Sequence, residues 1–165
     1  MNTSQSILYS PGRNDDCFTP RYVVEAVLPY LDRSKVYWLP FDTEESQFVK
    51  VLEENGFMFT SSHIRDGKDY FLYEPQHWDA MLSNPPFTGK RAVFERALGF
   101  GKPFALLMSN TWLNDSAPKV LFRDRGLQLL LFRNRIQYNN LGKITFSSSF
   151  FCCDFLPQQI IILDK

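Results

Sequence analysis

The chain has 165 residues, the length of one globular domain, and equal numbers of basic and acidic side chains (18 of each). Hydrophobic residues make up 44% and charged residues 22%, which argues against a disordered or membrane-embedded protein. The zero net charge argues against a polybasic nucleic-acid binder and against an acidic tail. Phenylalanine is unusually frequent at 16 residues, which predicts a dense aromatic core, a stacking surface, or both.

Residues 1–16 are polar and rich in serine, asparagine, proline and glycine, so we expect a flexible arm before a single domain over 17–165. They lack the apolar core of a signal peptide, and no apolar run reaches the roughly 18 residues of a membrane span. We therefore expect a cytoplasmic protein. The spacing of Cys17, Cys152 and Cys153 suits neither a disulfide framework nor a zinc site, so we expect reduced thiols and no metal.

Helical and strand patterns alternate along the chain. A first helix is expected from Thr19-Pro20, because proline is favoured at the first helical position, and Pro29 should disturb its last turn. A second helix should end at Asn55-Gly56. Two more helices are expected at 90–99 and 118–125. Strands are expected at 35–39, 57–61, 78–83, 103–108, 128–132, 150–155 and 159–163, with a short element at 70–72.

This alternation predicts an α/β fold with a mostly parallel sheet flanked by helices, closed by an antiparallel pair of C-terminal strands. In such sheets, ligands bind at the carboxyl ends of the strands. The loops 40–46 and 84–87 both follow strands, so we expect them to share that edge. The polar segment 134–149 is interpreted as a long functional loop or lid.

The sharpest motif is Asn84-Pro85-Pro86-Phe87, directly after an apolar strand. The two prolines fix the backbone and hold the Asn84 amide rigidly at the strand end. That arrangement suits a flat heterocycle with an exocyclic amine. The Asn84 oxygen and the Pro85 carbonyl can accept from the amine, while the Phe87 ring stacks on the heterocycle. The alternative is a proline-rich turn that only caps the strand.

With this motif, the chain from Phe18 to about Leu163 resembles the amino-methyltransferases that methylate the N6 of adenine, most of all their short phage-encoded members. The resemblance implies a Rossmann-like methyltransferase fold and S-adenosylmethionine as the methyl donor. It implies a nucleic-acid substrate, DNA favoured, whose target base is extruded or single-stranded. It also implies that Asn84 and the Pro85 carbonyl bind the target amine and that Phe87 stacks on the base, with Pro86 completing the motif.

The same resemblance implies a donor site formed from several loops. The segment Phe18-Thr19-Pro20 would line the methionine end of the cofactor, and Asp69 would meet its adenine amine. The cofactor-binding residues so expected are Phe18, Thr19, Pro20, Pro40, Phe41, Asp42, His63 and Asp69.

The donor loop departs from the family pattern, in which glycines let the backbone approach the cofactor closely. Thr43 and Glu45 stand at the glycine positions. Glu44 and Glu45 would crowd the pocket and repel the cofactor carboxylate, yet they could attract its ammonium or sulfonium. His63 replaces the acid that binds the ribose hydroxyls, and on its own it reads as a strand-end hydrogen-bonding residue.

Two interpretations of these departures stay open. In the first, the cofactor binds a rearranged loop in which Asp42, Glu44 or Asp66 replaces the lost contacts. In the second, the donor site is inactive and the fold serves as a binding module for nucleic acid or a host protein, such as a phage-encoded antagonist. A phosphate-binding loop is a weak third reading, because Gly99-Phe100-Gly101-Lys102 lacks the required spacing and final hydroxyl.

Charge is divided between the two halves of the chain. Residues 1–82 carry 7 basic and 13 acidic side chains, a net charge of −6, whereas residues 83–165 carry 11 and 5, a net charge of +6. Candidate contacts to a nucleic-acid backbone are Arg123, Arg125, Arg133, Arg135 and Lys143. The alternative is that these side chains are solvated ends of helices and strands. The short chain has no room for a separate target-recognition domain, which predicts relaxed sequence preference, a partner protein or a single-stranded substrate.

Overall fold

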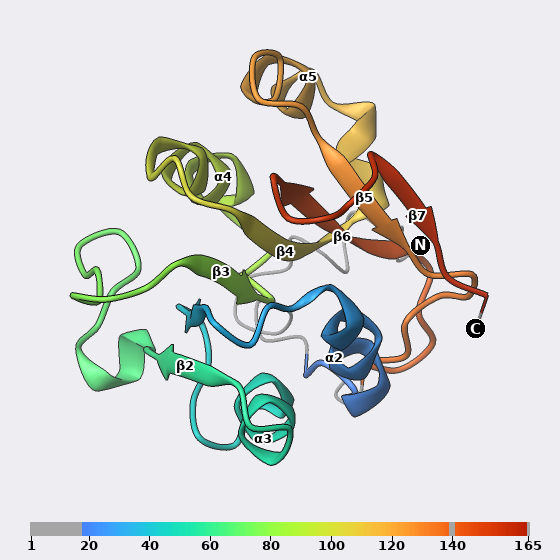
Figure 1. Ribbon diagram of the computed structural model, residues 1–165. Helices are drawn as coiled ribbons and strands as arrows, with labels where there is room; N and C mark the ends of the chain where they lie inside the picture. Colours follow the sequence, from blue (N-terminus) through green and yellow to red (C-terminus); the bar gives the residue numbers. More distant parts are fainter. Residues whose placement is uncertain (1–17, 139–140, 165) are drawn as a thin grey trace.

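The computed structural model describes residues 18–138 and 141–164, which form a seven-stranded sheet in the order β2-β1-β3-β4-β6-β5-β7 (Figure 1). The strands are β1 (Val36–Leu39), β2 (Met58–Ser61), β3 (Ala80–Ser83), β4 (Phe104–Ser109), β5 (Gln128–Leu131), β6 (Ser148–Cys153) and β7 (Ile160–Ile162). All neighbouring strands pair in parallel except at β6, which is antiparallel to both β4 and β5. The predicted α/β fold with a mostly parallel sheet is confirmed.

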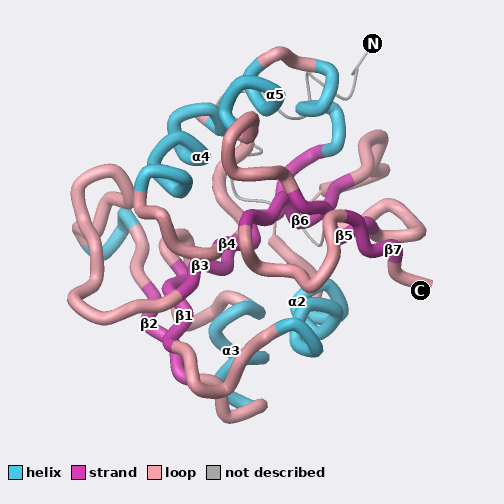
Figure 2. Tube along the Cα trace, turned by 45° about the horizontal axis from the view of Figure 1, so that its top comes forward, coloured by secondary structure: helices cyan, strands magenta, loops and turns pink. Residues whose placement is uncertain are grey.

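Helices cover both faces of the sheet, α2 and α3 on one and α4 and α5 on the other (Figures 1 and 2). The α-helices are α2 (Arg21–Val27), α3 (Gln47–Glu54), α4 (Lys90–Gly99) and α5 (Ala117–Leu121). The short 3-10 helices in the part of the chain that the structure describes are η1 (Leu28–Tyr30), η2 (Ile64–Asp66) and η3 (Asn110–Asn114). Within the described residues, no helix combines the length and the apolar character needed to cross a membrane. The predicted arm 1–16 and Cys17 lie outside the described residues.

Local signals in the sequence explain where the helices begin and end. Ser46 caps α3, because its side-chain oxygen accepts from the backbone N–H of Phe48 at 3.1 Å. The helix ends where predicted, at Asn55 and then Gly56, which adopts a left-handed φ of 72°. The α-helical turns of α2 give way to the 3-10 helix η1 at Pro29, the disturbance that this proline predicts.

Most of the phenylalanine excess is used in the core. On the α4/α5 face, Phe94 packs against Trp112 with ring centroids 4.6 Å apart and also contacts Phe151. On the α2/α3 face, Phe48 meets Phe150 edge to face at 6.4 Å. Successive residues of β6 therefore anchor opposite faces of the sheet, which makes this strand the centre of an aromatic core.

The C-terminal part of the fold corrects two expectations. The strands β6 and β7 run in opposite directions, as expected, but they do not pair with each other. Instead β5 lies between them and pairs with both. The reason is the connection over 132–147, which is long enough to bring the chain back between β4 and β5. The expected lid 134–149 also loses its last two residues to β6. The segment 70–72 forms turns rather than a regular element.

Candidate functional site

A cavity of about 580 Å³ opens at the carboxyl ends of β1, β2 and β3. In the sheet, β2 lies on one side of β1 and β3 lies on the other. This arrangement makes the carboxyl end of β1 a topological switch point, where sheets of this kind bind ligands. Nine of the predicted site residues line this cavity: Phe18, Thr19, Pro40, Phe41, Asp42, His63, Asp69, Asn84 and Pro86. Pro20 and Pro85 are buried beside these residues and do not line the cavity.

Asn84 is held at the wall of this cavity by the start of the described chain. Its Nδ2 donates a hydrogen bond to Oγ1 of Thr19 at 2.9 Å, and Thr19 is buried directly before α2. This contact joins two segments that are 65 residues apart. The rigid amide expected from the two prolines is therefore also fixed through its own side chain.

Phe87 does not reach the cavity. Its side chain is 1% exposed and meets Tyr138 and Phe146 edge to face, with ring centroids 6.3 and 5.8 Å away. A base cannot stack on this ring as it stands, because the rings of Tyr138 and Phe146 cover it. The aromatic rings exposed at the cavity instead belong to Phe18 (60% exposed) and Phe71 (44% exposed). Sequence reasoning missed Phe71, although it directly follows the Asp69-Tyr70 pair.

Asp42 is buried in the loop after β1, where it is 6% exposed. Its carboxylate accepts one hydrogen bond from Ser46 Oγ and another from Ser83 Oγ, each at 2.5 Å. Burial raises the pKa of Asp42 to about 6, although the two hydroxyl bonds oppose this shift. Both carboxylate oxygens are thus engaged by the protein. Asp42 lines the cavity, and its hydrogen bonds hold the loop together. Sequence reasoning missed Ser46 and Ser83 as its partners.

His63 and Asp69 organise the wall beside β2. The Nδ1 of His63 accepts from the backbone N–H of Arg65 at 3.1 Å and so begins η2, as expected of a strand-end hydrogen-bonding residue. The Oδ1 of Asp69 accepts from the backbone N–H of Phe71 at 2.9 Å and fixes that turn. Both side chains line the cavity while shaping their own loops.

The two glutamates of the loop 40–46 differ in whether they line the cavity. Glu45, at a position where the resembled family has glycine, lines the cavity, and so does Arg65. Glu44 and Asp66 are exposed and lie outside the cavity wall. Of the three acids considered as replacements for lost donor contacts, Asp42 is therefore the one at the cavity. Within residues 18–138 and 141–164, no three His, Cys, Asp or Glu side chains form a group that could hold a metal ion.

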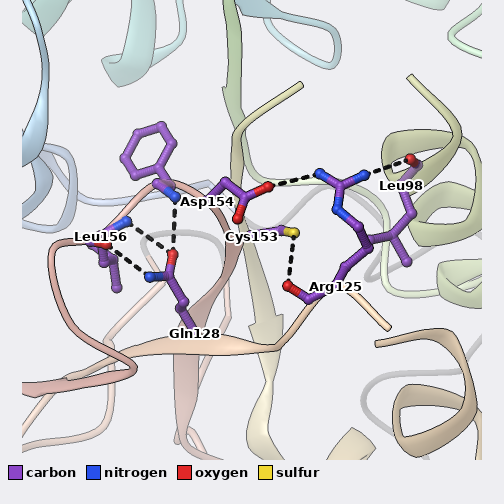
Figure 3. Close-up of polar contacts among 7 residues, drawn as sticks. Leu98, Arg125, Gln128, Cys153, Asp154 and Leu156 are labelled. Carbon is purple, nitrogen blue, oxygen red and sulfur yellow. Dashed lines mark hydrogen bonds and ion pairs between the residues drawn. The ribbon is translucent and has the colours of Figure 1, made fainter. Parts of the chain in front are cut away.

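The predicted basic residues do not form one surface. Arg125 lies at the amino edge of the sheet, opposite the cavity, where it pairs with Asp154 at 2.8 Å and donates to the carbonyl of Leu98 (Figure 3). The adjacent Cys153 thiol points to the Arg125 carbonyl at 3.9 Å, and Cys152 and Cys153 are free and buried. Arg125 lies at this edge because α5 is followed by the amino end of β5.

The remaining basic residues lie in two other places. Arg133 and Arg135 follow the carboxyl end of β5, and Lys143 lies in the same connection to β6. There the guanidinium of Arg135 donates to the carbonyl of Ile144 at 3.3 Å. Arg123 is exposed between α5 and β5. Of the predicted basic residues, those on the same carboxyl side of the sheet as the cavity are thus Arg133, Arg135 and Lys143.

No protein-family model and no curated protein matches the sequence. Among solved structures, the chain is similar to the crystal structure of a predicted O-methyltransferase, protein Atu636 from Agrobacterium tumefaciens. The two chains are 10% identical, the similarity covers 87% of this chain and 83% of the other, and the TM-score is 0.44.

Proposed function

We propose that the protein transfers a methyl group from S-adenosylmethionine to the N6 amine of adenine in nucleic acid, with DNA favoured. The observation that carries this proposal is the position of Asn84. Its amide is fixed by Thr19 on the wall of a cavity at the switch point of the sheet. A cavity of about 580 Å³ has the volume of a small-molecule site and accommodates a ligand of nucleoside size.

The cavity wall also fits the donor. S-adenosylmethionine carries a sulfonium, an ammonium and a flat adenine, and it supplies an electrophilic methyl group when bound. The carboxylates of Glu45 and Asp69 line the cavity and favour cationic groups of a ligand. The rings of Phe41 and Phe71 offer faces for a planar heterocycle. The glutamate at the glycine position is thus compatible with a cationic donor.

The chain's own contribution to this reaction is orientation. Nδ2 of Asn84 donates to Thr19, and Oδ1 is the acceptor of the same amide. This oxygen is buried in the structure, so a target amine reaches it only when the amide or the groups around it shift. A second acceptor is the carbonyl of Pro85, whose ring fixes the backbone beside it. Two acceptors at a rigid strand end align the nitrogen lone pair, and such alignment supplies much of the rate in a transfer between bound groups.

A second candidate is a catalytically inactive module that binds nucleic acid or a protein partner. The burial of Phe87 favours it, since Tyr138 and Phe146 occupy the surroundings of the ring on which a target base would stack. The two candidates differ in whether methyl groups are transferred, so an assay of transfer separates them.

The test is a transfer assay with S-adenosylmethionine labelled in its methyl group and random-sequence single-stranded DNA, duplex DNA and RNA. We expect label in N6-methyladenine, recovered from at least one polymer without a long recognition site. Asn84→Ala should abolish the label, and Gln158→Ala, an exposed change at the opposite edge of the sheet, should retain it. Binding of S-adenosylmethionine or nucleic acid without any transfer would instead support the inactive module.

A further inference from the structure

Asp42 connects the end of β2, the start of α3 and the end of β3. Its backbone N–H donates to the carbonyl of Ser62 at the end of β2, at 3.1 Å. Its side chain accepts from Ser46, the cap of α3, and from Ser83, the last residue of β3. The Ser83 contact joins residues 41 positions apart, and the next residue in the chain is Asn84.

These contacts lie outside the Asn84-Pro85-Pro86-Phe87 motif. The family that the sequence resembles places glycines in this loop, whereas here Thr43 and Glu45 stand beside an acid that lies inside the protein. Burying a carboxylate is costly unless it is hydrogen-bonded, and hydroxyl donors to an ionised oxygen form short, strong bonds. Because burying the Asp42 carboxylate costs free energy, we look for a role of this group beyond its contact with the cap of α3.

We propose that Asp42 is a positioning residue: by holding Ser46 and Ser83 together, its carboxylate fixes the strand end that carries Asn84 relative to the loop on the donor side of the cavity. The catalytic consequence rests on the proposed methyl transfer, whereas the mechanical link does not. When the carboxylate gains a proton, one of its oxygens becomes a donor, and one hydroxyl has to turn away or accept instead.

Protonation of Asp42 should therefore change the surroundings of Asn84 through Ser83. The other titratable groups on the cavity wall are Glu45 from the same loop, Arg65 and His63 near the end of β2, and Asp69 from the following loop. The hydrogen bonds to the Asp42 carboxylate come from the hydroxyls of Ser46 and Ser83. Substituting Asp42 alone therefore distinguishes the effect of its protonation from the effects of these neighbouring groups.

The test follows the backbone and side-chain amide signals of Asn84 by nuclear magnetic resonance from pH 4.5 to 8. In the unaltered protein we expect them to shift with a midpoint near pH 6, the pKa of Asp42. Asp42→Asn should remove this transition. Asp66→Asn, at an exposed acid outside the cavity wall, and His63→Gln should keep it. Ser83→Ala should also remove it while leaving the Ser46 bond intact, which provides a second test if Asp42→Asn does not fold.

A transition that persists in Asp42→Asn or in Ser83→Ala would overturn the proposal. In the transfer assay, Asp42→Asn should lower kcat about tenfold, the order expected when a reacting group loses its alignment, with a smaller change in KM for the nucleic acid. An unchanged kcat would overturn the catalytic consequence. If the unaltered protein transfers no methyl groups although the transition is present, the methyl-transfer proposal fails and the link through Asp42 stands.

Discussion

The two sides of the cavity edge differ in how open they are. On the side of β1 and β2, the loops leave a cavity into which Glu45, Asp69 and the ring of Phe71 face. On the other side, the motif that should meet the target base ends in Phe87, which is sealed by Tyr138 and Phe146. The side of β1 and β2 is thus open, whereas Tyr138 and Phe146 cover the ring of Phe87.

The largest expected effect tests the sealed side. Phe87→Ala should lower the free energy of unfolding by about 3–5 kcal/mol, because a buried ring leaves a cavity in a close-packed core. Phe71→Ala, at a partly exposed ring of the open side, should cost less than about 1 kcal/mol. Urea unfolding measures both. Similar small losses for the two variants would show that Phe87 is not sealed in solution.

The next effect concerns the acid between the two sides. The pKa of Asp42 is raised from 3.8 to about 6, so between these values the folded state binds more protons than the unfolded chain. The stability of the unaltered protein relative to Asp42→Asn should therefore fall by about 2 kcal/mol as the pH rises from 4 to 7. Urea titrations at both pH values check this. A difference that is flat with pH, or that rises, contradicts the buried position of the carboxylate.

A third prediction concerns the joint between the two sides. Asn84→Ala should lower methyl transfer by at least about 100-fold, since misplacing a reacting group costs this much. Affinity for S-adenosylmethionine should stay within a factor of about three, because Asn84 is one of many groups around the cavity. Thr19→Val removes the acceptor of the Asn84 hydrogen bond and should give a smaller loss of transfer. A Thr19→Val variant whose methyl transfer is as slow as that of Asn84→Ala would mean that Thr19 has a role of its own.

The smallest effect comes from a matched pair on the open side. Glu45 lines the cavity and its neighbour Glu44 does not. Glu45→Gln should weaken binding of S-adenosylmethionine about threefold to tenfold, and the loss should shrink at high salt, because the attraction is a partly screened charge interaction. Glu44→Gln should leave the affinity unchanged. Equal losses would assign the effect to overall charge rather than to the cavity.

The sequence predicts the parts of the fold that depend on local signals. The stop at Asn55-Gly56 and the apolar run of β4 each depend on neighbouring residues, and each element forms close to its predicted bounds. The order of the last three strands does not follow from such signals. The connection 132–147 places β6 between β4 and β5, so β7 pairs with the remaining edge of β5.

The candidate site divides in the same way. Positions directly after strands predict that Asn84, Asp42 and His63 line one cavity, because the carboxyl ends of parallel strands share an edge. The partners of these residues come from distant segments. Neither the bond between Asp42 and Ser83 nor the burial of Phe87 is visible in the spacing of a motif. Side-chain packing in three dimensions decides both.

The most direct test of the central claim is a calorimetric titration of S-adenosylmethionine into the purified protein, with and without single-stranded DNA. The account predicts saturable binding at one site per chain, weakened by Glu45→Gln and unaffected by Glu44→Gln. The absence of binding under both conditions would contradict a preformed donor side and remove the basis for methyl transfer.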